Sequence, residues 1–69
     1  MLADSELRQA LSAAAATERL VRHHVETLRQ GGNELACGRA AYRNAVGLRK
    51  ALEDWVSVRE WRARQQTTA

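Results

Sequence analysis

Proline and phenylalanine are both missing from this chain, and each absence narrows the range of folds. Without proline, no segment carries the residue that most strongly interrupts a helix. With two Trp, one Tyr and no Phe among 69 residues, few bulky side chains are available for a core. Much of the apolar content is alanine, which favours helix but buries little area. We therefore expect one all-α domain that gains stability by association with itself or with another chain.

Cysteine is almost missing as well. The single Cys37 excludes a disulfide within the chain and indicates a reducing compartment such as the cytoplasm. The first residues show no signal pattern of charged, apolar and small side chains, and no apolar run is long enough to span a bilayer. We expect a cytoplasmic protein without a membrane-inserted segment.

The net charge of +3 is unevenly distributed along the chain. Residues 1–30 hold four basic and four acidic side chains, whereas residues 39–64 hold seven basic and three acidic ones. Basic residues interspersed with acids are more typical of a solvated helix face than of a nucleic-acid interface.

An apolar row in residues 39–64 repeats at alternating steps of four and three, the spacing of a helix packed lengthwise along another helix. Its members are Ala41, Ala45, Leu48, Leu52, Trp55 and Arg59, with Val56 beside them. The row predicts a second helix over about 39–64 that requires a helical partner.

The same alternation occurs in residues 4–30, which predicts a first helix. The row there is Leu7, Leu11, Ala14, Glu18, Val21, Val25 and Leu28. Glu18 is its one charged member, and a charge at such a position costs stability unless it is paired or reaches solvent. Residues 13–16 are all alanine, so another helix could approach closely there.

Glycines separate the two rows. The turn between the helices is expected within residues 31–39, at Gly31 and Gly32, at Gly38, or over the whole interval. Residues 65–69 form a polar tail that we expect to fray. The prediction is an antiparallel two-helix hairpin with Leu7, Leu11, Val21, Val25 and Leu28 facing Leu48, Leu52, Trp55 and Val56.

No residue pattern indicates catalysis, a cofactor or a metal. His23 and His24 are adjacent, so they point in different directions on a helix and do not chelate one ion as an i, i+4 pair does. Nothing in the pattern orients Cys37 as a nucleophile, and the chain is short for building a pocket. We expect a protein that is not an enzyme.

A two-helix hairpin leaves part of its apolar surface uncovered, and such surface on a small domain commonly marks an interface. Four large apolar side chains lie at or beyond the edges of the predicted rows. These candidates for partner contact are Leu20, Tyr42, Val58 and Trp61.

One family shares several of these features. Gly38, Tyr42 and the run Ala51-Leu52-Glu53 occur at spacings compatible with the second helix of the small E component of the type III secretion needle chaperone, which this chain resembles. The resemblance implies a helical hairpin that acts as a cytoplasmic co-chaperone in virulence-associated protein transport. It also implies a tetratricopeptide-like partner, with which the protein would hold the needle subunit unpolymerised.

A homodimeric four-helix bundle that regulates through nucleic acid is the alternative. In that case the basic second helices would face outward, and affinity would fall steeply with salt.

Overall fold

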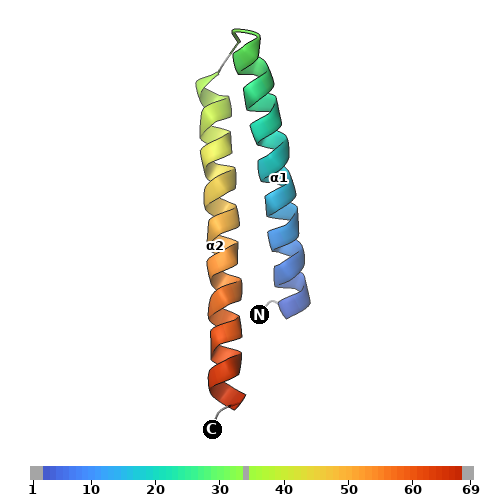
Figure 1. Cartoon of the computed structure of the whole chain (residues 1–69), viewed down its shortest axis with the longest axis vertical. Coiled ribbons are helices and arrows are strands. Elements are labelled where there is room, and N and C mark those ends of the chain that lie inside the picture. The colour runs from blue at the N-terminus through green and yellow to red at the C-terminus, as the bar shows by residue number, and fades with distance from the viewer. Residues whose placement is uncertain (1–2, 34, 68–69) are drawn as a thin grey trace.

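The computed structural model describes residues 3–33 and 35–67 and consists of two long α-helices, α1 (Asp4–Gln30) and α2 (Ala36–Thr67). They lie antiparallel in a hairpin of 58 × 17 × 15 Å, with both ends of the chain opposite the turn (Figure 1). No strand occurs among the described residues. The predicted all-α hairpin is confirmed.

Helix α1 ends in a glycine cap. Gly32 has φ of +75°, the left-handed conformation that glycine adopts without strain. Its N–H donates to the Arg29 carbonyl at 3.1 Å, and the Asn33 N–H donates to the Leu28 carbonyl at 2.8 Å. This bond pattern is the Schellman motif, which satisfies the last carbonyls of a helix. Among the turn positions left open by the sequence, the break is therefore at Gly31 and Gly32.

Gly38 lies inside α2, which begins at Ala36, three residues before the expected start at 39. A Cβ atom at Gly38 would lie 3.6 Å from Val25 Cγ2, an ordinary van der Waals contact, so α2 passes close to α1 there. The helix also continues to Thr67, beyond the expected end at 64, and runs past the beginning of α1 (Figure 1).

The interface between the helices is thin. Only Leu7, 1% exposed, and Ala14 are buried among the described residues. Five further residues of the predicted core are half-buried: Leu11, Val21 and Val25 on α1, and Leu52 and Val56 on α2.

Three residues of the predicted core are exposed instead, and for them the prediction is wrong. Leu48 is 56% exposed, Trp55 44% and Leu28 39%. The row of α2 that faces α1 is shifted by one residue at every second position, so α2 is slightly rotated: Arg49 rather than Leu48 points across the interface to Glu18. Leu28 lies in the last turn of α1, where the first residues of α2 are small.

Most of the half-buried residues of α2 define the observed row. It keeps the predicted steps of four and three but runs through Gly38, Tyr42, Ala45, Arg49, Leu52, Val56 and Arg59. The rotation moves Leu48 and Trp55 to one edge of the hairpin, where they are available to another molecule.

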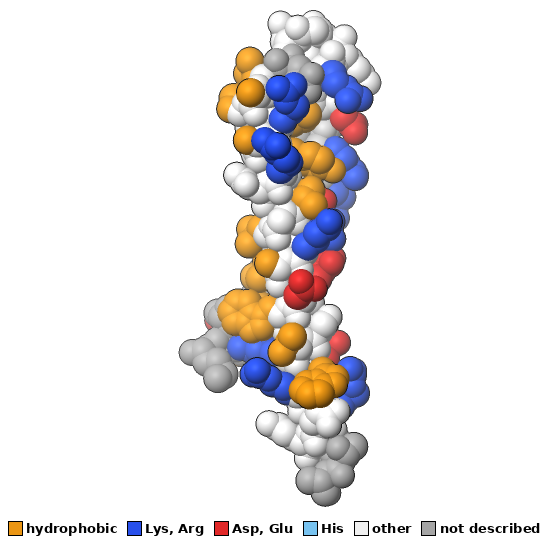
Figure 2. Space-filling view, turned by 90° about the vertical axis from the view of Figure 1, so that its left-hand side faces the viewer, with side chains coloured by type: hydrophobic (Ala, Val, Ile, Leu, Met, Phe, Trp, Pro, Cys, Tyr) orange, Lys and Arg blue, Asp and Glu red, His pale blue; other side chains and the backbone are white. Residues whose placement is uncertain are grey.

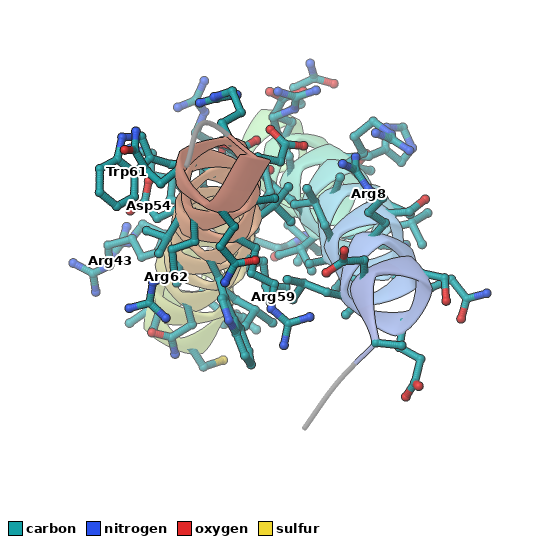
Figure 3. The ribbon with its side chains drawn as sticks, turned by 90° about the horizontal axis from the view of Figure 1, so that it is seen from below. Arg8, Arg43, Asp54, Arg59, Trp61 and Arg62 are labelled. Atoms are coloured by element: carbon teal, nitrogen blue, oxygen red, sulfur yellow. The ribbon has the colours of Figure 1, made fainter. Side chains whose placement is uncertain are left out.

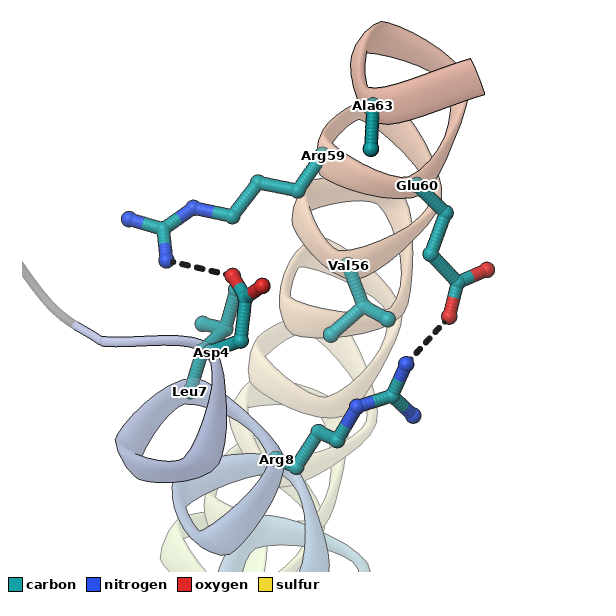
Figure 4. A pocket seen from close by; sticks show the side chains of 7 residues that line it. All are labelled: Asp4, Leu7, Arg8, Val56, Arg59, Glu60 and Ala63. Atoms are coloured by element: carbon teal, nitrogen blue, oxygen red, sulfur yellow. Dashed lines mark hydrogen bonds and ion pairs between the residues drawn. The ribbon is translucent and has the colours of Figure 1, made fainter. Parts of the chain in front are cut away.

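Two ion pairs hold the open end of the hairpin. Arg59 Nη1 lies 3.1 Å from Asp4 Oδ1, and Arg8 Nη2 lies 2.5 Å from Glu60 Oε1 (Figure 4). The pairs flank the apolar contact of Leu7 with α2, so they fix the lateral position of the first turn of α1. Because Asp4, Arg8 and Glu60 are largely exposed, we expect a small contribution to stability from each pair.

Candidate functional site

A groove between the helices exposes the apolar edge that the rotation creates. Its wall on α2 is Ala45, Leu48 and Leu52, and its volume is about 430 Å³. The residues that α1 contributes are small, which keeps the groove open: Ala10, Ala13, Ala14 and Thr17. We call this surface the alanine groove.

The alanine groove continues along α2 toward its C-terminal end. Trp55 follows Leu48 by seven residues, two helical turns, and therefore lies on the same side of α2. Trp55 and Val58 line the next hollow together with Arg59 and Arg62. In the upper part of Figure 2 hydrophobic side chains line the left edge of α2 and basic ones lie in the middle and toward the right, whereas near the C-terminal end the two kinds are mixed. The result is an apolar strip that ends at two arginines.

Arg59 supports the position of Trp55. Its guanidinium carbon lies 5.5 Å from the centre of the Trp55 ring, a cation–π distance, while the same side chain pairs with Asp4. In the view along the helix axes Arg59 points toward α1, whereas Arg62 points away from it (Figure 3). A contact to α1 thus restrains one flank of the Trp55 ring.

The four predicted partner-binding residues do not form one site. Leu20, three residues after Thr17, lies on the flank of the alanine groove and is exposed, and Val58 lies on the adjoining strip. Tyr42 is half-buried and lines a separate groove with several arginines. Trp61 is 55% exposed and points away from α1; seen along the helix axes, it projects from the same side of α2 as Asp54 and Arg43, which lie further along the helix (Figure 3).

Glu18 and Arg49 close the interface beside the alanine groove. Arg49 Nε donates to Glu18 Oε2 at 2.5 Å, and Arg49 Nη2 donates to Glu18 Oε1 at 3.2 Å. The hydrogen bond from Arg49 holds the pKa of Glu18 below its ordinary value of 4.5, and the same contact raises the pKa of Arg49. Arg49 also binds Glu53 one turn further along α2, at 3.1 Å.

Sequence reasoning found Glu18 as an anomalous member of the first row but missed its partner. The sequence did contain a signal for this partner. A row through Arg49 places a cation opposite Glu18, the one charged member of the first row, whereas a row through Leu48 places an aliphatic side chain there. Because apolar spacing alone ranked Leu48 and Trp55 above Arg49, the rotation went unpredicted.

The side chains considered for chemistry remain apart from the groove. His23 and His24 lie side by side with ring centres 5.9 Å apart, and Cys37 is an exposed free thiol. Over residues 3–33 and 35–67, no group of three or more His, Cys, Asp or Glu side chains is placed to hold a metal ion. In the same part of the chain, neither helix is apolar enough over a sufficient length to cross a membrane.

Comparison with family models, with curated proteins and with solved structures finds no match to this chain.

Proposed function

We propose that this protein is a protein-binding adaptor that accepts a helix of its partner in the alanine groove. The proposal rests on one observation: small side chains of α1 line the alanine groove, and Leu48 and Trp55 are exposed along the adjacent edge of α2. Exposed aromatic and aliphatic groups beside a depression are the usual anchors of an interface.

A helix fits this surface better than an extended segment does. Two antiparallel helices offer a straight groove parallel to their axes, and a third helix laid in it completes a bundle. Alanines allow the backbones to approach closely, while larger side chains of the guest helix fill the space beside Leu48 and Leu52. The hairpin itself buries little, so covering this face also stabilises the adaptor.

The resemblance to the E component of the needle chaperone supplies a concrete form of this function. A tetratricopeptide-like protein consists of stacked helix pairs and offers exposed helices of the required kind. In this form the adaptor stabilises the tetratricopeptide-like subunit, and the pair keeps a needle subunit unpolymerised in the cytoplasm.

The experiment begins with capture of the partner from the native host by tagged full-length chain, followed by calorimetry on the two purified proteins. The double variant Leu48→Ala/Trp55→Ala should bind at least about tenfold more weakly, as expected when two apolar anchors are lost. The matched control, Ala51→Ser/Trp61→Ala, removes one Trp from the outward face and should bind within about threefold of wild type.

Two results would overturn the proposal. Equal affinity of both double variants for the partner would exclude the alanine groove as the binding surface. A stable homodimer that Leu48→Ala/Trp55→Ala dissociates, together with salt-sensitive binding to duplex DNA, would instead support the nucleic-acid regulator. Sedimentation velocity and DNA titration at two salt concentrations measure these properties.

A further inference from the structure

A second groove lies near the turn, and its chemistry differs from that of the alanine groove. Val25 from α1 and Tyr42 from α2 provide its apolar part, and its volume is about 350 Å³. The rest of the lining is charged, with four arginines and one carboxylate: Arg22, Arg29, Arg39, Arg43 and Glu26. We call this surface the arginine groove.

The arginine groove lies on the opposite side of the hairpin from the alanine groove. Tyr42 and Arg49 are seven residues apart and share one side of α2, whereas Leu48 and Trp55 share the other. Over the half of α2 nearer the turn, basic side chains accordingly lie toward one edge and hydrophobic ones along the other (Figure 2). A molecule bound in one groove therefore leaves the other groove accessible.

Ion pairs are more frequent further along this side than in the arginine groove. Further along, Arg49 pairs with Glu18 and Glu53, and Arg8 pairs with Glu60. Arg22, Arg29 and Arg43, in contrast, form no ion pair within 4 Å among the residues that the structure describes, although the charge of Arg22 helps to lower the pKa of Glu18. Three guanidinium groups thus surround an apolar depression with their bidentate donors available.

The spacing of these arginines follows helical turns. Arg22 and Arg29 are two turns apart on α1, about 10 Å along the axis. Arg39 and Arg43 are one turn apart on α2, about 6 Å. Carboxylates at positions i, i+4 and i+7 of a helix are separated by these same distances of about 6 and 10 Å along its axis. A helix lying in the groove can therefore present carboxylates to the arginines of α1 and of α2.

We propose that the arginine groove binds an acidic amphipathic helix of a protein, with a Leu-sized side chain against Val25 and Tyr42 and carboxylates on Arg22, Arg29 and Arg43. Charge complementarity identifies the occupant, and the apolar floor distinguishes it from a sugar–phosphate backbone. This contact is separate from the partner helix in the alanine groove and does not depend on it.

The test uses the full chain and a fluorescein-labelled, lactam-stapled 15-residue helical peptide with Leu at every third or fourth position and Glu beside each Leu. Fluorescence anisotropy should show saturable binding that weakens with salt. A peptide with Gln in place of every Glu should bind at least about tenfold more weakly, because charged hydrogen bonds to arginine are lost.

Two charge-reversed proteins locate the binding site. Arg29→Glu/Arg43→Glu should lose the acidic peptide, whereas Arg19→Glu/Lys50→Glu, with the same net charge but changes outside the groove, should retain it within about threefold. Circular dichroism should show equal helicity for both. If Arg29→Glu/Arg43→Glu loses helicity, the milder Arg29→Gln/Arg43→Gln variant takes its place and should bind at least about fivefold more weakly than wild type.

Three outcomes would overturn the inference. If both charge-reversed proteins lost affinity for the peptide equally, the peptide would be attracted by the net charge of the protein alone. Tighter binding of a 15-base-pair DNA duplex, also lost in Arg29→Glu/Arg43→Glu, would assign the groove to nucleic acid. If Leu48→Ala/Trp55→Ala lost the peptide and Arg29→Glu/Arg43→Glu retained it, the peptide would bind in the alanine groove. The adaptor proposal is tested separately: if it alone fails, Arg29→Glu/Arg43→Glu should still lose the acidic peptide.

Discussion

Arg49 reaches across the hairpin to Glu18 and donates two hydrogen bonds to its carboxylate, at 2.5 and 3.2 Å. With exposed fractions of only 25% and 13%, the two side chains lie within the interface and set which row of α2 faces α1. If Leu48 faced α1 instead, the carboxylate would lie beside an aliphatic side chain without a donor. The pair therefore links the rotation of α2 to the exposure of Leu48 and Trp55.

The pair should show thermodynamic coupling. We expect Glu18→Gln and Arg49→Met each to lower the melting temperature, and the double variant to lower it by less than the sum of the two, because no charge is then left without its partner. A parallel cycle with Arg8→Met and Glu60→Gln at the exposed end is the control and should show weaker coupling. Additive losses at Glu18 and Arg49 would contradict the role assigned to the pair.

Acid should reverse this stabilisation. Since the folded protein holds the pKa of Glu18 below the ordinary value of 4.5, the stabilisation is complete above that value and is lost as pH falls through the lowered pKa. Thermal melts between pH 7 and pH 2 should show this loss. It should be smaller in Glu18→Gln, and an identical pH profile in the two proteins would exclude Glu18 as its source.

Leucine truncations should separate the interface from the exposed edge. Leu7→Ala should cost about 2–5 kcal/mol of unfolding free energy, the range for a fully buried leucine. Leu52→Ala, at a half-buried position, should cost less than Leu7→Ala but more than Leu48→Ala, which lies on the edge. Urea denaturation measures all three, and a larger loss for Leu48→Ala than for Leu52→Ala would mean that the row predicted from sequence is the correct one.

Two glycine substitutions should have opposite signs. Gly47 lies in α2 with no atom within 4 Å of an added Cβ, so Gly47→Ala should stabilise the protein by about 0.5–1 kcal/mol through helix propensity. Gly32→Ala places a side chain at φ of +75° and should destabilise by about 1 kcal/mol. Thermal melts of the two variants test the helix and the cap separately.

The sequence predicted the elements better than their mutual rotation. The first row, from Leu7 to Val25, faces α2 as expected, because α1 has only one apolar stripe. In α2 both Leu48 and Arg49 continue an alternation of four and three, and hydrophobicity favours Leu48. Only the pairing with Glu18, a contact between residues 31 positions apart, distinguishes the two rows. The arginine groove was missed for the same reason, since each helix contributes half of it.

Trp61 and Trp55 give the last prediction, because the sequence favoured Trp61 for partner contact and Trp55 for the core. In the structure Trp55 is exposed on the apolar strip next to Arg59, whereas Trp61 points outward from α2. With the partner in the alanine groove, Trp55→Ala should weaken the complex by at least about 1 kcal/mol, the loss expected for an aromatic anchor. Trp61→Ala should weaken the complex by less than half as much.

Each of these variants retains one Trp, so acrylamide quenching of its fluorescence provides a second readout. Trp55, the Trp that remains in Trp61→Ala, should be protected from acrylamide by the partner. Trp61, the Trp that remains in Trp55→Ala, should not be protected. Protection of Trp61 alone would move the interface to the outward face of α2.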